Sequence, residues 1–292
     1  MNELAEAWRS RGHLRSLGGH QIFTVDIPSQ GTEVLAPLLV LHGFPTSSFD
    51  FHHVADRLAA HRRVLLFDML GYGLSEKPDR AYTFSVQADI AMAFLESLRI
   101  DRLGLLTHDV GDTLGGELLA RDLEGTWTVE ITDRAMTNGS IYHELARLSV
   151  GQQFLLALPD ERLTPDARLG RTAVMDGIAA TFSPATVVDP TESAAQWDMI
   201  AHLDGDLLLP RLIRYIDERR SHERRFTGAI EQHPSPLVVL WGEDDPIAVP
   251  AMADVLCGGR TDIECRLLDG VGHYPMVEAP DRFVEGLSWS RP

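Results

Sequence analysis

Asp109 is the residue whose type and setting point most directly to chemistry. It lies at the centre of residues 107–111, Thr-His-Asp-Val-Gly, between an apolar run at 103–106 and a helix-like segment at 114–123. A sharp turn from strand to helix lifts its central side chain above the carboxyl edge of a sheet, as in the serine-centred G-x-S-x-G turn. The carboxylate of Asp109 is therefore predicted to be a nucleophile. The alternative is that Asp109 only caps the helix that follows.

An acid and a histidine follow Asp109 along the chain, each behind an apolar run. The acid comes from the consecutive residues Glu243, Asp244 and Asp245, and His273 lies in Gly-Val-Gly-His-Tyr-Pro. The order nucleophile, acid, histidine is the one found in triads whose nucleophile sits on a strand–turn–helix. The position just before a proline selects Asp245 as the partner of the histidine, with Asp244 as the alternative.

A second loop offers backbone donors near the nucleophile. Residues 41–45, Leu-His-Gly-Phe-Pro, follow an earlier apolar run. A loop at this place supplies one N–H of an oxyanion hole, and the residue after the nucleophile supplies the other. We expect these donors to be the backbone N–H groups of Phe44 and Val110. His42 is predicted to brace the loop rather than titrate during turnover, and His108 to support the site.

Together these groups favour covalent catalysis by a carboxylate. Asp109 attacks an electrophilic carbon by displacement and forms an alkyl ester. His273, oriented by Asp245, then deprotonates a water that attacks the ester carbonyl. A serine would acylate itself on an ester or amide, whereas an aspartate would form an anhydride. The aspartate therefore favours epoxides or alkyl halides over ordinary esters as substrates.

The elements that must position these residues alternate between strand and helix. Helix-like segments separate apolar, strand-like runs at 37–41, 64–67, 103–106, 237–241 and 263–268. Such alternation predicts a parallel sheet covered by helices on both faces. A hairpin is predicted at residues 13–27, turning at Gly18 and Gly19.

The middle of the chain has a different character. It is helix-like, polar and interrupted by prolines. We expect residues 1–137 to form the first part of a core, 138–228 an inserted helical cap, and 229–292 the second part of the core. The charged run from Arg219 to Arg225 is expected to be a solvated helix end rather than an anion site.

Composition bounds the possible partners. The chain has 292 residues, 26 of them basic and 43 acidic, which gives a net charge of -17. This charge disfavours nucleic acid and anionic membranes as partners. No apolar run has the length of a secretion signal or a membrane-spanning helix, so we expect a cytoplasmic protein.

Cofactors and cross-links are not indicated by the sequence motifs. No glycine-rich phosphate motif is present, so no nucleotide is expected. His52 and His53 have no acidic or cysteine partners at metal-ligand spacing, so no metal is expected. Cys257 and Cys265 leave one disulfide open but make no disulfide framework.

With these motifs placed, the sequence resembles the α/β-hydrolase superfamily over nearly its full length. It is most similar to the aspartate-nucleophile branch, the epoxide hydrolases and haloalkane dehalogenases. Closer still is the mesoderm-specific transcript protein group, which it resembles at residues 68–78, 107–112, 196–199, 214–219 and 272–275. The resemblance implies an α/β-hydrolase fold with a mostly parallel, eight-stranded sheet and an inserted helical cap. It also implies no cofactor and a small apolar electrophile that reacts with water.

The resemblance leaves epoxides and halides open. Haloalkane dehalogenases place a halide-binding tryptophan after the nucleophile, where this chain has Val110. Epoxide hydrolases use two cap tyrosines to polarise the epoxide oxygen. Tyr215 and Tyr142 are candidates for this role, Trp197 is a third donor, and packing is the alternative role of each. We expect epoxide hydrolysis to a vicinal diol, with haloalkane dehalogenation or a non-catalytic binding protein as alternatives.

Overall fold

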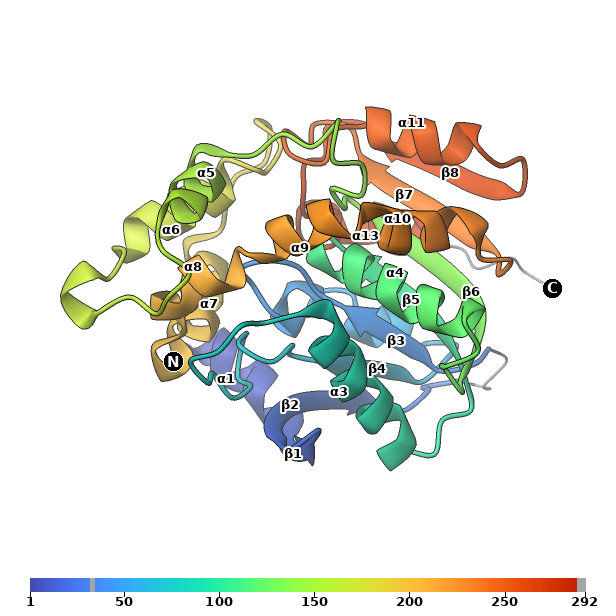
Figure 1. Ribbon diagram of the computed structural model, residues 1–292, viewed down its shortest axis with the longest axis horizontal. Helices are drawn as coiled ribbons and strands as arrows, with labels where there is room; N and C mark the ends of the chain where they lie inside the picture. The colour runs from blue at the N-terminus through green and yellow to red at the C-terminus, as the bar shows by residue number, and fades with distance from the viewer. Residues whose placement is uncertain (32–34, 288–292) are drawn as a thin grey trace.

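A computed structural model describes residues 1–31 and 35–287 and shows one eight-stranded sheet (Figure 1). The strand order is β1-β2-β4-β3-β5-β6-β7-β8. All pairs are parallel except β1–β2 and β2–β4, so β2 runs opposite to the other strands. The strands are β1 (Gly12–Leu17), β2 (His20–Ile27), β3 (Leu38–Leu41), β4 (Val64–Phe67), β5 (Arg102–His108), β6 (Glu130–Thr137), β7 (Leu237–Gly242) and β8 (Ile263–Leu268). The predicted mostly parallel sheet is confirmed. The predicted hairpin is β1–β2, and Gly18 and Gly19 at its turn both have positive φ.

Helices cover both faces of this sheet because its central strands are apolar on both sides. In β3, Leu39 and Leu41 pack into one core cluster, whereas Leu38 and Val40 pack into another. The first cluster includes residues of α3 (Phe84–Ser97), α4 (Val110–Leu123), α10 (Glu223–Gln232) and α11 (Ala251–Gly258). The second includes residues of α1 (Glu3–Ser10), α2 (Ala55–Leu58), α12 (Pro275–Glu278) and α13 (Pro280–Gly286).

The segment between β6 and β7 contains most of the remaining helices. They are α5 (Val150–Ala157), α6 (Arg171–Ala179), α7 (Pro190–Ala201), α8 (Leu209–Leu212) and α9 (Tyr215–Ser221). Helices α5 to α8 gather at one end of the molecule, on the left in Figure 1. The cap boundaries at 138 and 228 stay a proposal, because α10 crosses the second boundary and packs against α4 of the core.

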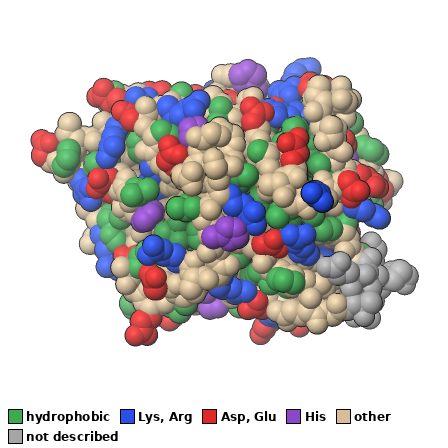
Figure 2. Space-filling model, turned by 90° about the horizontal axis from the view of Figure 1, so that it is seen from below, with side chains coloured by type: hydrophobic (Ala, Val, Ile, Leu, Met, Phe, Trp, Pro, Cys, Tyr) green, Lys and Arg blue, Asp and Glu red, His purple; other side chains and the backbone are tan. Residues whose placement is uncertain are grey.

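A disulfide joins helix α11 to the edge strand β8. Cys257 in α11 and Cys265 in β8 form a disulfide, with 6.2 Å between their Cα atoms, so the pairing that the sequence left open is present. Acidic and basic side chains are interspersed over the face shown in Figure 2. Of the helices in the described ranges, none combines the length and apolar character needed to cross a bilayer.

Candidate active site

Asp109 occupies the turn between β5 and α4 in a strained backbone conformation. Its φ is 50° and its ψ is -112°, a combination that side-chain-bearing residues rarely adopt. The turn is tight: a Cβ at Gly111 would lie 2.3 Å from the carbonyl oxygen of Leu41. Within the described chain, the Asp109 side chain makes no capping hydrogen bond to α4. Helix capping therefore does not explain this aspartate.

Backbone N–H groups hold the buried carboxylate of Asp109. The N–H of Phe44 donates a 2.9 Å hydrogen bond to its Oδ2, and the backbone of Val110 also hydrogen-bonds the carboxylate. The loop approaches closely because residue 43 is glycine, whose Cβ would lie 2.8 Å from the same Oδ2. Burial raises the pKa of Asp109, while His273, Arg219 and the two backbone donors oppose that rise.

Asp245 is the acid that the structure places beside His273. Nδ1 of His273 lies 2.7 Å from Oδ2 of Asp245, and both side chains are buried. Oδ1 of Asp245 accepts hydrogen bonds from the backbone N–H groups of Ile247, at 2.8 Å, and Ala248, at 3.0 Å. Asp244 instead accepts a 2.6 Å hydrogen bond from the hydroxyl of Ser183.

The charge of Asp245 sets the protonation of its partner. Burial alone would lower the pKa of His273, but the neighbouring carboxylates of Asp245 and Asp109 outweigh it and raise the pKa to about 9. Near neutral pH, His273 is therefore an imidazolium flanked by two carboxylates. Such perturbed titration within a buried cluster is typical of catalytic groups.

Asn138 is a site residue that the sequence argument missed. Its side-chain N–H donates to Oδ2 of Asp245 at 2.8 Å, and its Oδ1 accepts from the backbone N–H of Gly242 at 3.1 Å. Asn138 has a φ of 52°, a left-handed conformation that asparagine tolerates better than most residues. The available sequence signal is the Asn-Gly pair that directly follows the apolar end of β6.

His42 and His108 are neutral structural groups. Nδ1 of His42 lies 2.9 Å from the carbonyl of Gly43, and its Nε2 accepts a 3.0 Å hydrogen bond from the N–H of Met69. Nε2 of His108 lies 2.8 Å from the carbonyl of His273. Burial lowers the pKa of both His42 and His108. They connect the loop at residues 41–45 and the turn at Asp109 to their surroundings.

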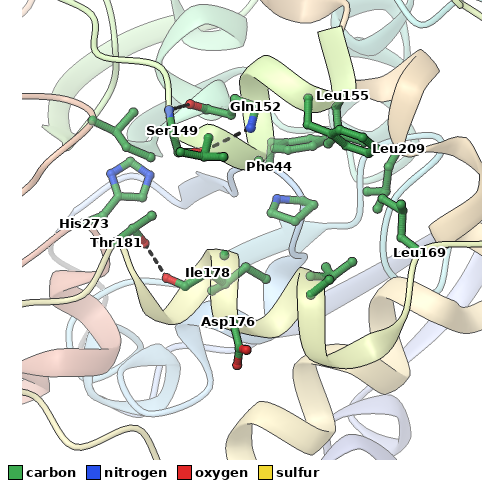
Figure 3. A pocket seen from close by; sticks show the side chains of 18 of the residues that line it. Phe44, Ser149, Gln152, Leu155, Leu169, Asp176, Ile178, Thr181, Leu209 and His273 are labelled. Atoms are coloured by element: carbon green, nitrogen blue, oxygen red, sulfur yellow. Dashed lines mark hydrogen bonds between the residues drawn. The ribbon is translucent and has the colours of Figure 1, made fainter. Parts of the chain in front are cut away.

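A cavity of about 580 Å³ opens beside Asp109 and His273. Figure 3 shows His273 at one end, Leu169 and Leu209 at the other, and Asp176 pointing away from the space. The lining contains Phe44, Pro45, Ser149, Gln152, Phe154, Leu155, Ala173, Val174, Ile178, Ile247 and Tyr274, among others. Most of these side chains are apolar, so the cavity suits a small apolar substrate.

Tyr215 contacts two residues of this lining, Phe44 and Gln152, and itself lines a smaller neighbouring cavity of about 140 Å³. Its ring packs against Phe44 at a centroid distance of 5.4 Å, and Nε2 of Gln152 donates a 3.3 Å hydrogen bond to its oxygen. Since that oxygen already accepts a hydrogen bond, its own O–H remains available as a donor. Burial and the charge of Asp109 raise the pKa of Tyr215, so the phenol keeps its proton. The sequence did not single out Gln152.

Arg219 corrects the expected solvated helix end. It is only 6% exposed, and its guanidinium carbon lies 5.0 Å from the centre of the Tyr215 ring. Its Nε donates a 2.7 Å hydrogen bond to the hydroxyl of Thr113 in α4. Only the later part of the run behaves as expected, since Arg225 pairs with the carboxylate of Glu124 near the surface. Because the neighbouring residues are charged, the sequence does not indicate that α9 directs the Arg219 side chain into the protein.

The other two predicted cap donors are not brought to Asp109. The hydroxyl of Tyr142 donates a 2.8 Å hydrogen bond to Oε1 of Glu231 in an exposed pair. Trp197 in α7 packs against the core cluster that contains Trp8 of α1. Both side chains therefore have the packing or surface roles that were the alternative for them.

The structure also corrects the expectation for the paired histidines. Glu192, 139 positions beyond His53, places its carboxylate beside His52 and His53. Within the described residues, these three form the group of side chains arranged to hold a metal ion, with ligand atoms within 4.8 Å of one another. The sequence argument missed this acidic partner because it considered only partners at short spacing.

Comparison with known proteins agrees with this architecture. Residues 38–286 match the model of the alpha/beta hydrolase family. LipZ of Mycobacterium tuberculosis is 34% identical over 281 residues, covering 95% of this chain and 94% of LipZ. The mesoderm-specific transcript homolog protein of Homo sapiens is 32% identical over 289 residues, covering 95% of this chain and 85% of that protein.

Solved structures share the fold at low sequence identity. A loop variant of the haloalkane dehalogenase DbeA from Bradyrhizobium elkanii has a TM-score of 0.72 at 20% identity, covering 94% of each chain. The epoxide hydrolase CorEH has a TM-score of 0.71 at 16% identity, covering 94% of this chain and 95% of its own. The family match and the relatives that span nearly the whole sequence show that this chain belongs to the alpha/beta hydrolase family.

Proposed function

We propose that this protein opens epoxides to vicinal diols through a covalent ester on Asp109. The proposal rests on how backbone hydrogen bonds fix the Asp109 carboxylate. One oxygen, Oδ2, accepts the N–H of Phe44, which leaves the other oxygen as the attacking atom. His273 is tied to Asp245 through Nδ1, so its Nε2 is the nitrogen left to act on water. A buried aspartate in this arrangement suits displacement at carbon.

In the first step, the free oxygen of Asp109 attacks one epoxide carbon while the carbon–oxygen bond breaks. The epoxide oxygen takes a proton from the hydroxyl of Tyr215, which Gln152 leaves free to donate. Negative charge thereby moves from Asp109 toward the Tyr215 oxygen, and Arg219 beneath that ring stabilises it there. The products of this step are the alkyl ester and a tyrosinate.

In the second step, His273 acts as the base for hydrolysis. The ester no longer carries the charge of Asp109, so one of the three carboxylate charges that raise the pKa of His273 is gone and its proton can leave to solvent. Neutral Nε2 then takes a proton from a water that attacks the ester carbonyl. The N–H groups of Phe44 and Val110 stabilise the charge on Oδ2. As the intermediate collapses, the ester C–O bond breaks and His273 gives the proton it took from water to the departing alkoxide, which releases the diol. The carboxylic acid left on Asp109 passes its proton to His273, and Tyr215 takes a proton from solvent, which replaces the one that His273 lost.

Haloalkane dehalogenation is the second candidate, because it uses the same ester and the same base. Gln152 lines the cavity and uses one amide hydrogen on Tyr215, so its other amide hydrogen can meet a departing halide. Val110, where dehalogenases carry an indole donor, disfavours this candidate. A binding protein without turnover is the third, and it predicts no ester.

One labelling experiment separates a covalent carboxylate from its alternatives. Excess enzyme is given a single turnover of an epoxide or haloalkane in heavy-oxygen water, and the peptide containing Asp109 is weighed. We expect label in that carboxylate, none in Asp109→Asn, and accumulated ester in His273→Gln. Asp176→Asn is the matched control, because Asp176 points away from the cavity. Diol formation without label would overturn the mechanism.

A further inference from the structure

We propose that His52, His53 and Glu192 form a binding site for a divalent transition-metal ion such as Zn²⁺. The two imidazoles and the carboxylate offer three ligand atoms that lie within 4.8 Å of one another. The histidines follow the 3₁₀ turn η1 (Ser48–Phe51) of the core, whereas Glu192 lies in α7 of the middle segment. A bound ion would therefore join these two parts of the chain. The site is separate from the proposed reaction and does not depend on it.

The hydrogen bonding of His52 fixes which nitrogen faces the site. Its Nδ1 lies 2.8 Å from the carbonyl oxygen of Phe49, which only accepts, so the proton is on Nδ1 and the lone pair is on Nε2. That Nε2 is buried and finds no hydrogen-bond donor among the described residues. Metal-bound histidines are oriented in this way by a carbonyl on their other nitrogen. His52 is thus presented as a ligand.

Glu192 and His53 complete the set from the opposite side. Oε1 of Glu192 contacts Nε2 of His53 and lies 3.4 Å from Nε2 of His52. The two imidazole rings lie side by side, with centroids 3.9 Å apart. Oε1 of Glu192 thus lies near Nε2 of both histidines, and a cation would bind among these three atoms.

The ligands are held on ordered elements. The ring of His52 stacks on Phe49 at a centroid distance of 4.2 Å and an interplanar angle of 4°. The start of α7 is fixed by Asn2, whose side chain donates a 2.7 Å hydrogen bond to the carbonyl of Thr191. Little reorganisation is needed for binding, which favours affinity.

A polar cavity of about 400 Å³ adjoins the site at Glu192. Its lining includes Glu192 together with Asp189, Gln196 and Glu278. It has room for water, which would fill the coordination positions that the protein leaves open. The net charge of -17 also favours cations near this surface.

The donor set selects the class of metal. Two imidazole nitrogens and one carboxylate oxygen suit Zn²⁺, Co²⁺, Ni²⁺ or Cu²⁺, whereas Ca²⁺ and Mg²⁺ prefer sites made of oxygen alone. Three protein ligands leave a fourth tetrahedral position for water. Because imidazoles must be neutral to bind, affinity is expected to fall in acid.

The test measures metal binding directly on the full chain after chelator treatment. Zn²⁺ is titrated against a chromophoric competitor, and Co²⁺ binding is followed by its visible absorption. We expect one ion per chain. His53→Gln and Glu192→Gln should each weaken binding at least about tenfold. His61→Gln, which alters an exposed histidine away from the site, is the matched control and should change nothing.

Thermal unfolding provides a second measurement that needs no variant. Zn²⁺ at about a hundredfold excess over its Kd should raise the Tm by at least about 4 °C, whereas Mg²⁺ should not. Binding that survives in both His53→Gln and Glu192→Gln would place the ion elsewhere and overturn the proposal. So would a chain that binds neither Zn²⁺ nor Co²⁺, which would leave His53 and Glu192 as an ion pair.

Discussion

The side-chain amide of Asn138 donates a 2.8 Å hydrogen bond to Oδ2 of Asp245, the same oxygen that contacts Nδ1 of His273. These three residues follow β6, β7 and β8, which are neighbours in the sheet. Backbone N–H groups of Ile247 and Ala248 occupy the other oxygen of Asp245. Donors therefore surround this carboxylate, and they fix the orientation in which it holds His273.

The first prediction concerns Asn138→Gly. Glycine accepts the left-handed backbone at this position, so the change removes the side chain without adding strain. The loss leaves one face of Asp245 without its donor, and we expect the free energy of unfolding to fall by about 1–3 kcal/mol. We also expect kcat to fall about tenfold because His273 is less well oriented. Urea unfolding and steady-state kinetics measure the two effects.

A companion variant separates the side chain from the backbone. Asn138→Ala removes the same amide but keeps a Cβ at positive φ, so it should unfold more easily than Asn138→Gly by about 1 kcal/mol. Unchanged kcat in Asn138→Gly would show that Asp245 and His273 keep their geometry without this donor.

Much of the fold was predictable because its signals are local. Each central strand is a short apolar run, and the residues predicted as nucleophile, acid and histidine each follow such a run. The carboxyl ends of parallel strands lie at one edge of a sheet, so strand order alone brings Asp109, Asp245 and His273 together. The turn at Asp109 also has its own signature, since Gly111 has no space for a Cβ.

The rest depends on contacts between distant segments or on the direction of one side chain. His53 and Glu192 are 139 positions apart, so no spacing rule connects them. Arg219 lies in a run of charges that predicts exposure, yet it is buried under Tyr215. Tyr142 and Tyr215 are the same residue type in the same segment of the chain. Only the packing of the helices distinguishes them, because it brings Tyr215 near Asp109.

The second prediction uses that difference between the tyrosines. Tyr215→Phe removes the proton donor, and we expect the rate of ester formation to fall by about 10²–10⁴-fold, while ester hydrolysis changes less. Tyr142→Phe is the matched control, because its hydroxyl bonds Glu231 at the surface and its loss should leave the rate within about twofold. Rapid-quench single turnovers measure both steps. Equal effects of the two substitutions would exclude Tyr215 as the donor.

Gln152→Leu tests the same proton transfer from Tyr215 and should have a smaller effect than Tyr215→Phe. It keeps the size of the side chain but removes the hydrogen bond that orients the Tyr215 hydroxyl. We expect a loss of about tenfold in ester formation, the effect of one neutral hydrogen bond. In the Tyr215→Phe background the same change should have little further effect, because the group that it orients is already gone.

The third prediction concerns Arg219→Met. Its charge opposes the rise that burial causes in the pKa of Asp109, so its removal should raise that pKa further. The acid limb of the ester-formation rate should therefore move to higher pH, with a fall of about tenfold or more at neutral pH. Arg220→Met, on the exposed neighbour, is the control. A lower rate with an unmoved acid limb would mean that Arg219 acts through packing alone.

The fourth prediction separates the two chemical steps by pH. The pKa of His273 is raised to about 9 partly by the charge of Asp109, and esterification removes that charge. Ester formation does not use His273 as a base, so its rate should vary little with pH above the acid limb. Ester hydrolysis needs the neutral imidazole and should rise with pH to a plateau that begins below 9. A plateau beginning above 9 would show that esterification does not lower the pKa of His273.

The fifth prediction concerns how the contribution of His273 to the free energy of unfolding changes with pH. The pKa of His273 is about 9 in the folded chain and about 6.5 in an unfolded one, so folding favours the protonated form. The resulting stabilisation is fully present below about pH 6.5 and is lost as the pH rises from there through 9. His273→Gln removes it, so wild type should exceed this variant in unfolding free energy by more at about pH 6 than at about pH 9.5. Urea unfolding at both pH values measures the gap, with His61→Gln as the control. A gap that stays constant with pH would show that His273 titrates alike in the folded and unfolded chain.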